Sequence, residues 1–275
     1  MLSSKAMPAI MPWVIGNWKM NPETSVAQQQ LTQQLIEHIA EHLASGTELL
    51  NVNLAVAPTL LHLLMVQQQT QQANSPIQVI AQDVSRFAGT GAYTGDVSAQ
   101  LLANAGINMT LIGHSERRSL YGEDATVLRE KLQAAISAGL KVVFCVGETL
   151  TEREAGHAEQ VVLHQLDEVF DCIALQHWQQ NLMVAYEPVW AIGTGKTASP
   201  QDAESMHAAI RAGLKNYHSS LVDLPILYGG SVKPDNAASL AACANINGAL
   251  VGGASLDADS FIKIARAFSQ DRKAG

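Results

Sequence analysis

The 275-residue sequence lacks most features that mark membrane, secreted or nucleic-acid-binding proteins. Its three cysteines, Cys145, Cys172 and Cys243, are widely spaced and odd in number, so they predict neither a disulfide framework nor a metal site built from cysteine pairs. No apolar run approaches the ~20 residues of a membrane span, and residues 1–12 are too proline-broken for a signal peptide. The net charge of −8 disfavours nucleic acid and anionic membranes as partners. We therefore expect a cytoplasmic protein with reduced cysteines.

What the sequence has in quantity is short apolar runs separated by amphipathic stretches. Hydrophobic residues make up 47% of the chain, enough for a large core in one domain of barrel size or in two small ones. Between the runs, apolar residues recur at helical spacing, as in Leu31, Leu35, Ile39 and Leu43. Eight runs read as buried parallel strands: 13–15, 52–56, 77–80, 109–112, 142–146, 182–185, 225–228 and 248–251.

Eight strand-and-helix units in succession, without a linker, indicate one closed α/β barrel. A doubly wound open sheet, the alternative, fits eight uninterrupted units of this length less well. We therefore predict a single (β/α)8 barrel over residues 13–270, with residues 1–12 as an N-terminal extension and 271–275 as a C-terminal tail. In such a barrel the carboxyl ends of the strands form the catalytic face.

Glu187 stands just past the predicted strand 182–185, which puts its carboxylate at that catalytic face. The next helix is expected only at Ser199, so an eleven-residue loop remains over 188–198. A loop of this length with glycines near its middle is a candidate lid, and a glycine-rich surface turn is the alternative. The candidate lid comprises Ala191, Ile192, Gly193, Thr194 and Gly195.

The first predicted strand leads into Asn17-Trp18-Lys19, which places an amide and an ammonium group two residues apart. In an extended backbone, side chains two residues apart lie on one face. Asn17 and Lys19 could therefore address the same ligand. An ordinary surface lysine is the alternative interpretation.

The fourth predicted strand leads into Gly113-His114-Ser115-Glu116. This run resembles the nucleophile elbow of hydrolases, but Arg117 replaces the closing glycine, so Ser115 is not predicted to be a nucleophile. His114 is the better candidate. Because it lies just before a helix start, we expect its pKa to be lowered, which would leave a neutral imidazole able to donate a hydrogen bond to a carbonyl oxygen.

The last two predicted strands end in glycine pairs, in Gly229-Gly230-Ser231 and in Gly252-Gly253. Glycine lets backbone N–H groups approach a ligand closely, and the loops after strands seven and eight of a barrel commonly bind phosphate. Tight turns without a ligand are the alternative. Two such pairs at these particular strands favour a phosphate site.

A metal site is not predicted. His38 and His42 have the i and i+4 spacing of a zinc pair, but the glutamate of that motif is missing. The predicted groups suit a different chemistry. They are a strand-end carboxylate at Glu187, a neutral histidine at position 114, Lys19 and two phosphate loops. Such a site can abstract a proton next to the carbonyl group of a phosphorylated substrate.

These motifs together closely resemble the triosephosphate isomerase family, over about residues 13–267. The resemblance implies a TIM barrel and an isomerase of glycolysis and gluconeogenesis. Such an enzyme interconverts dihydroxyacetone phosphate and D-glyceraldehyde 3-phosphate by proton transfer through an enediolate, with no metal and no cofactor. The resemblance rests on Asn17 with Lys19, His114-Ser115-Glu116, the run from Glu187 to Lys196, Tyr228-Gly229-Gly230-Ser231 and Gly252-Gly253.

The same resemblance implies a role for each of these residues. Glu187 would be the base and His114 the neutral electrophile. Lys19 and Asn17 would be electrostatic stabilisers, and Glu116 would support them. Backbone groups would hold the phosphate, at Gly193, Ser231, Gly252 and Gly253.

Segment 82–95, with Tyr93 and Thr94 near its end, looks like the loop through which members of this family form a homodimer. A second copy of the chain is therefore the expected protein partner. Two positions depart from the family. Asp83 stands where it usually has asparagine, and Asp96 where it usually has glutamate.

Asp83 raises a question of charge within that loop. If a second subunit covers the loop, burial of an unpaired carboxylate would raise the pKa of Asp83. Replacing it by asparagine would then stabilise the protein. Pairing with Arg86 or with another cation is the alternative, and it would reverse the sign.

Two other functions remain open for this barrel. One is a protein that binds sugar phosphates without turning them over, and the intact set of Glu187, His114 and Lys19 weighs against it. The other is a metal-dependent sugar-phosphate epimerase, and the lack of a His/Asp cluster at the strand ends weighs against that.

Overall fold

The computed structural model describes residues 10–45, 49–192 and 198–269. All eight predicted strands are present in it, each overlapping its predicted run by most of its length. The strands are β1 (Trp13–Asn17), β2 (Asn53–Ala57), β3 (Gln78–Val79), β4 (Met109–Ile112), β5 (Lys141–Val146), β6 (Leu182–Tyr186), β7 (Ile226–Tyr228) and β8 (Gly248–Val251).

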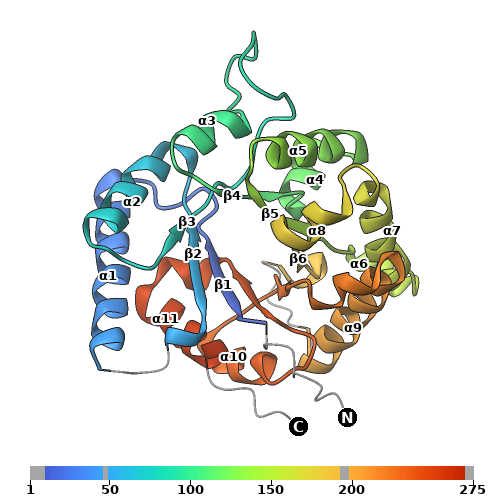
Figure 1. Cartoon of the computed structure of the whole chain (residues 1–275). Coiled ribbons are helices and arrows are strands. Elements are labelled where there is room, and N and C mark those ends of the chain that lie inside the picture. Colours follow the sequence, from blue (N-terminus) through green and yellow to red (C-terminus); the bar gives the residue numbers. More distant parts are fainter. Residues whose placement is uncertain (1–9, 46–48, 193–197, 270–275) are drawn as a thin grey trace, which may run out of the picture.

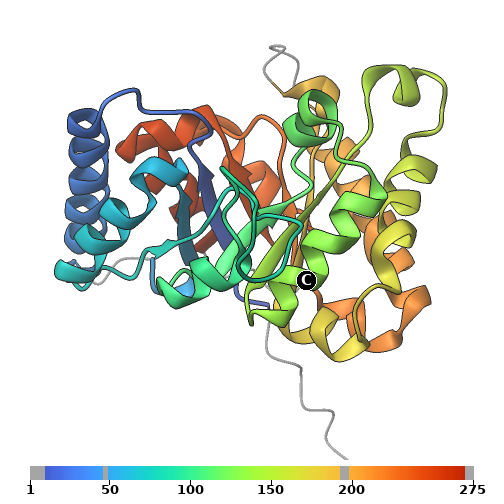
Figure 2. The same cartoon turned by 90° about the horizontal axis from the view of Figure 1, so that it is seen from above.

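Helices follow the strands and surround them, as Figures 1 and 2 show from two directions. Short 3-10 turns lie at Leu49–Asn51 (η1), Val189–Ala191 (η2), Ser219–Asp223 (η3) and Gly253–Leu256 (η4). The helices are α1 (Ser25–Ala44), α2 (Leu60–Gln72), α3 (Ala99–Asn104), α4 (Ser115–Tyr121), α5 (Ala125–Ser137), α6 (Leu150–Glu154), α7 (Ala158–Phe170), α8 (Leu175–Asn181), α9 (Pro200–Tyr217), α10 (Pro234–Ala241) and α11 (Ala258–Ser269). Within the described ranges no helix is long and apolar enough to cross a membrane.

The strands form one parallel sheet in the order β3-β2-β1-β8-β7-β6-β5-β4. Its two edge strands approach each other at Ala81, which forms a single parallel bridge with Thr110 of β4. The Ala81 N–H donates to Met109 O and the Ala81 carbonyl accepts from the Leu111 N–H, both at 2.9 Å. The sheet is therefore a nearly closed barrel, and the predicted single (β/α)8 barrel is confirmed.

Alternation along the strands divides the core into two layers. On β1, Trp13 and Ile15 point into the barrel while Val14 points out to the helices, because successive strand residues face opposite sides. The outer layer takes the predicted faces of the helices, including Leu31, Leu35 and Ile39 of α1. The inner layer comprises Trp13, Ile15, Ala55, Ala57, Ile80, Met109, Leu111, Val143, Cys145, Met183, Ala185, Leu227 and Leu250.

Helix ends agree with the signals in the sequence. Ser199 caps α9 by accepting from the Asp202 N–H at 3.1 Å, and Pro200 is the first residue of that helix. Gly106 and Gly139 follow α3 and α5 with φ of 81° and 79°, where a side chain would be strained. The helices thus begin next to the carboxyl ends of the strands, which places their N-termini around the predicted catalytic face. Of the three free cysteines, only Cys145 is fully buried.

Candidate active site

Glu187 is the first residue after β6, and its backbone is fixed by the neighbouring strands. Its N–H donates to Val146 O at 2.7 Å. Two glycines leave room for it: a Cβ atom at Gly147 would lie 1.8 Å from Glu187 O, and one at Gly229 would lie 2.9 Å from Glu187 Cγ. The side chain is only 2% exposed. Glycines on the flanking loops therefore let a large carboxylate lie in the mouth of the barrel.

Both oxygens of the Glu187 carboxylate have partners. Oε1 lies 2.9 Å from His114 Nε2, and Oε2 accepts from the Ser115 N–H at 2.8 Å. Strands β4 and β6 thus bring together the predicted acid and histidine, which are 73 residues apart in the sequence. The Ser115 backbone contact could not be predicted from the sequence, which drew attention to the serine hydroxyl instead.

His114 is the N-cap of α4, as the sequence led us to expect. Its Nδ1 accepts from the Glu116 N–H at 3.2 Å, so the ring proton lies on Nε2, which faces Glu187. Burial is the largest influence on the pKa of His114 and lowers it, but the Glu187 carboxylate raises it, and Glu116 adds to the rise. The net direction is upward from 6.5. The lowered pKa expected from the sequence is therefore wrong while Glu187 faces the ring.

Lys19 reaches the site from the loop after β1. Its Nζ pairs with Glu116 Oε1 at 2.5 Å, and the two side chains are 28% and 44% exposed. The prediction of an extended backbone between Asn17 and Lys19 is wrong, because Lys19 has a left-handed φ of 53°. Its N–H donates to Asn17 Oδ1 at 3.0 Å. Asn17 therefore acts on the backbone of the lysine as well as lying near the site.

The two glycine-rich loops lie side by side because β7 and β8 are neighbours in the sheet. The Ser231 carbonyl accepts from Asn236 Nδ2 at 2.9 Å, and the Gly252 carbonyl accepts from the Ser255 N–H at 2.8 Å. A Cβ atom at Gly252 would lie 3.7 Å from Lys19 Cε, so the β8 loop borders the lysine. Gly253 opens the turn η4. These contacts fix the backbone that the sequence predicts will bind phosphate.

The candidate lid is described only at its flanks. Ala191 ends the turn η2 and is buried, and Ile192 follows it. Gly193, Thr194 and Gly195 lie outside the described residues.

A polar cluster that the sequence did not reveal holds the start of the loop over 188–198. The Glu148 carboxylate accepts from Trp190 Nε1 at 2.8 Å and from the Tyr186 hydroxyl at 3.1 Å. Burial raises the pKa of Glu148, although these hydrogen bonds lower it. The Arg153 guanidinium lies 4.6 Å from the centre of the Trp190 ring and also pairs with Asp202 at 2.9 Å. One arginine therefore touches both flanks of the loop.

Asp83 belongs to a group of four charged side chains at the base of the 82–95 loop. Its carboxylate contacts Lys131 Nζ at 2.6 Å and Arg117 Nε at 2.8 Å, and both cations also contact Glu123 at 2.6 Å. Burial raises the pKa of Asp83, while Lys131 and Arg117 lower it. The expected direction of the pKa shift is thus confirmed, but the premise of an unpaired carboxylate is wrong. Arg86 pairs with a glutamate of α5 instead.

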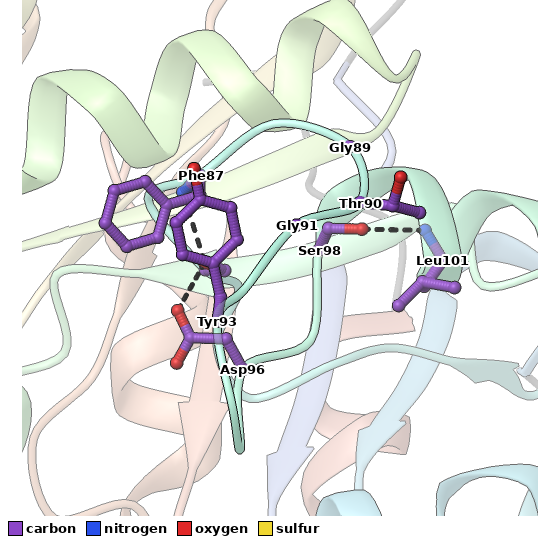
Figure 3. Close-up of a pocket in the computed structure, with 9 residues that line it drawn as sticks. Phe87, Gly89, Thr90, Gly91, Tyr93, Asp96, Ser98 and Leu101 are labelled. Carbon is purple, nitrogen blue, oxygen red and sulfur yellow. Dashed lines mark hydrogen bonds between the residues drawn. The ribbon is translucent and has the colours of Figure 1, made fainter.

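Loop 82–95 stands away from the barrel at the top of Figure 1. Figure 3 shows a pocket at its end, where the rings of Phe87 and Tyr93 stack with centroids 3.9 Å apart. Ser85 Oγ donates to Asp96 Oδ2 at 2.6 Å, so the aspartate at this position ties the two sides of the loop together. Thr94 is exposed.

Within the described part of the chain, no three His, Cys, Asp or Glu side chains are grouped as a metal ion would require. The groups that do converge are Glu187, His114, Lys19 and Glu116, next to the loops after β7 and β8. They can move a proton and stabilise negative charge on a bound oxygen.

Comparison with known proteins agrees with this geometry. The model of the triosephosphate isomerase family matches residues 12–268. A triosephosphate isomerase of Acinetobacter baumannii is 52% identical over 263 residues, which cover 96% of this chain and 98% of the relative. One from Acinetobacter baylyi is 51% identical over 264 residues, covering 96% and 98%. One from Rhizobium etli is 48% identical over 231 residues, covering 84% of this chain and all of the relative.

Proposed function

This chain belongs to the triosephosphate isomerase family and is an enzyme of that activity, and from this premise we propose which residues carry out the reaction. The reaction is the reversible interconversion of dihydroxyacetone phosphate and D-glyceraldehyde 3-phosphate, a step of glycolysis. It moves a proton between two neighbouring carbons through an enediolate. The site therefore needs a base, a hydrogen-bond donor for the oxygens and a holder for the phosphate.

Glu187 is the proposed base. The observation that carries the proposal is that its buried carboxylate is aimed by Ser115 N–H at 2.8 Å and by His114 Nε2 at 2.9 Å. A carboxylate held in this way at a strand end can reach the carbon next to the substrate carbonyl. When it turns to that carbon, it leaves the imidazole.

His114 is the proposed electrophile. Its Nε2 proton, now facing Glu187, would donate to the substrate carbonyl oxygen. With the Glu187 carboxylate withdrawn, the largest influence that raises the pKa of His114 is gone, and burial, which lowers it, remains. The ring then stays neutral as the oxygen gains negative charge.

Lys19 and Asn17 are the proposed stabilisers of that charge, with Glu116 holding the lysine through the ion pair at 2.5 Å. The phosphate would lie against backbone groups of Ser231, Gly252 and Gly253, and of Gly193 from the loop outside the described residues. All the required groups are side chains or backbone of the protein. This supports a reaction without metal or cofactor, carried by the barrel over residues 13–270.

A homodimer is proposed as the working form. Within the described ranges, ten of the twelve large hydrophobic residues that are exposed belong to the first four strand-and-helix units between residues 20 and 121. They include Met20 at 90% exposure, directly after Lys19, and Leu61 at 83%. This concentration of exposed apolar side chains in the part of the chain that carries the projecting loop supports a surface that another protein covers. The ten are Met20, Val26, Leu60, Leu61, Leu64, Phe87, Tyr93, Leu101, Leu120 and Tyr121.

A cytoplasmic location is proposed as well, supported by the free thiols and by the glycolytic reaction. The substrate and a second copy of the chain are the proposed partners, with neither nucleic acid nor membrane among them.

Turnover of glyceraldehyde 3-phosphate, coupled to reduction of the dihydroxyacetone phosphate formed, tests the proposed function. The assay is run with and without a chelator. Equal rates in both are expected of a cofactor-free isomerase. Binding without turnover would point to a sugar-phosphate sensor, and loss of activity with the chelator would point to a metal-dependent enzyme.

A further inference from the structure

The backbone of Lys19 is held in a conformation that lysine does not favour. Among the described residues other than glycine, only Lys19 and Asn74 have a positive φ, 53° and 50°. Asparagine tolerates this region of backbone space, whereas lysine enters it at a cost in energy. A residue in such a conformation stays there only if its surroundings hold it. The contacts of the Lys19 peptide groups are therefore informative.

Gln82 supplies one of those contacts from another part of the barrel. Its Nε2 donates to the Lys19 carbonyl at 2.7 Å and to the Ala57 carbonyl, at the end of β2, at 2.8 Å. The two hydrogens of one amide group thus span the ends of β1 and β2. On the other side of Lys19, its N–H donates to Asn17 Oδ1 at 3.0 Å.

Gln82 is well placed to aim its amide. It directly follows Ala81, whose N–H and carbonyl both bond to β4 at 2.9 Å. It directly precedes Asp83, whose carboxylate contacts Lys131 and Arg117. Because the backbone is anchored on both sides, the glutamine side chain starts from a fixed point, as a positioning group must.

We propose that Gln82 is a positioning residue for Lys19: by holding the lysine carbonyl, it keeps the backbone left-handed and the ammonium group at the substrate site. This rests on the role of Lys19 in the proposed function. Gln82 is also the first residue of the 82–95 loop. The base of the proposed dimer loop and the proposed catalytic lysine are therefore joined by a single amide group.

Two variants remove the contact in different ways. Gln82→Met keeps the length of the side chain but has no donor. Gln82→Glu keeps the shape and sets a carboxylate oxygen against two carbonyl oxygens. Gln78→Met, at an exposed position on β3 four residues earlier, is the matched control. A displaced ammonium group costs about 10- to 100-fold in kcat, so we expect that loss in both variants and none in the control.

The KM separates a positioning role from damage to the fold. Partial unfolding lowers the concentration of active enzyme, which lowers the apparent kcat and leaves KM unchanged. A displaced lysine weakens binding of the anionic substrate as well, so KM should rise together with the fall in kcat. A kcat and KM within twofold of the Gln78→Met control, or a fall in kcat at constant KM, would overturn the proposal.

A double-mutant cycle with Lys19→Ala tests whether the effect passes through the lysine. With no ammonium group to position, Gln82→Met should lower the residual rate by less than threefold, measured at raised enzyme concentration. An equal loss in both backgrounds would show that Gln82 acts elsewhere. If Lys19→Ala itself kept wild-type kcat, the proposed function of the lysine would fail, an outcome distinct from a silent Gln82 variant.

Discussion

The Glu187 carboxylate lies 2.9 Å from His114 Nε2, so the proposed base accepts a hydrogen bond from the proposed electrophile. For a substrate to contact both groups in their proposed roles, this contact must break. Until then each group is the hydrogen-bond partner of the other, so neither is buried without a hydrogen bond.

Glu187→Gln tests the base directly. Glutamine keeps the shape and can still accept from the Ser115 N–H, but it cannot take up a proton from carbon. We expect kcat to fall by roughly 10²- to 10⁴-fold, with much less change in KM. The coupled assay measures both, and Glu159→Gln at the exposed start of α7 is the control. A variant with nearly wild-type kcat would remove Glu187 from the mechanism.

Titration of His114 tests how the pair is coupled. The pKa of His114 lies above 6.5 chiefly through the Glu187 carboxylate, against the effect of burial. A raised histidine pKa stabilises the fold below the unfolded pKa, and that contribution is lost as pH rises through the folded pKa. In Glu187→Gln the raising charge is gone, so the pKa should drop below 6.5. NMR of the ring resonances in both proteins, without substrate, gives the answer. An unchanged pKa would mean that Glu187 does not control it.

Asp83→Asn tests the group of four charges. The raised pKa of Asp83 favours stabilisation by asparagine, whereas the contacts favour the reverse. We give the contacts more weight, because the mutation leaves Arg117 and Lys131, the latter only 5% exposed, with the single carboxylate of Glu123. We expect a loss of about 1–3 kcal/mol at pH 8, seen as a lower Tm at fixed protein concentration.

The same experiment at pH 5 checks the cause. A carboxyl group whose pKa is raised by folding binds its proton more readily in the folded state than in the unfolded chain. Lowering the pH to 5 should therefore stabilise the wild type but not Asp83→Asn, and the difference between the two proteins should widen. A higher Tm for the mutant at pH 8 would show that desolvation of Asp83 outweighs its pairing.

Thr94→Arg tests the proposed dimer loop. Thr94 is exposed in a single subunit, next to the stacked Tyr93. A charged side chain forced into a packed interface costs more than the contact gives, so we expect a monomer of low activity. Sedimentation at micromolar concentration distinguishes the two forms, and Gln160→Arg on α7 adds the same charge at another exposed position. A stable dimer would place the interface elsewhere.

Shortening the loop within residues 191–195 tests the candidate lid. Its flank at Trp190 is held by Glu148, and its other flank at Asp202 by Arg153. If the loop excludes water from the enediolate, the shortened enzyme should release more free phosphate per turnover. Phosphate and product are measured in the same reaction. An unchanged ratio would contradict a lid.

The barrel could be predicted because strand and helix periods depend on local sequence. Runs such as 182–185 and 248–251 are apolar at every position, as is typical of strands buried on both faces. Glu187 and His114 could be found because each stands two residues past a predicted strand. The strand ends of a barrel all lie on one face, so two residues far apart in the chain could be expected to meet.

What could not be predicted depends on contacts between distant parts of the chain. The left-handed backbone of Lys19 depends on a carbonyl contact from Gln82, 63 residues away. The pKa of His114 depends on which group faces its Nε2 as well as on the helix behind it. The pairing of Asp83 depends on Lys131, 48 residues along the chain. The spacing of hydrophobic residues along the chain carries no information on such polar contacts.

The barrel has a seam. Every other pair of neighbouring strands is joined within the sheet. Among the described residues, the short strand β3 is joined to β4 by one isolated bridge, from Ala81 just after β3 to Thr110. Local opening of the sheet is easiest where few hydrogen bonds join two strands. The Leu111 N–H, which donates to Ala81 across this seam, should therefore exchange its hydrogen sooner than the amides between β5 and β6. Gln82 is the next residue after Ala81. Opening of the Ala81 bridge should therefore also release the Gln82 contact to the Lys19 carbonyl, so the lifetime of this bridge should limit how long the proposed catalytic lysine is held in place.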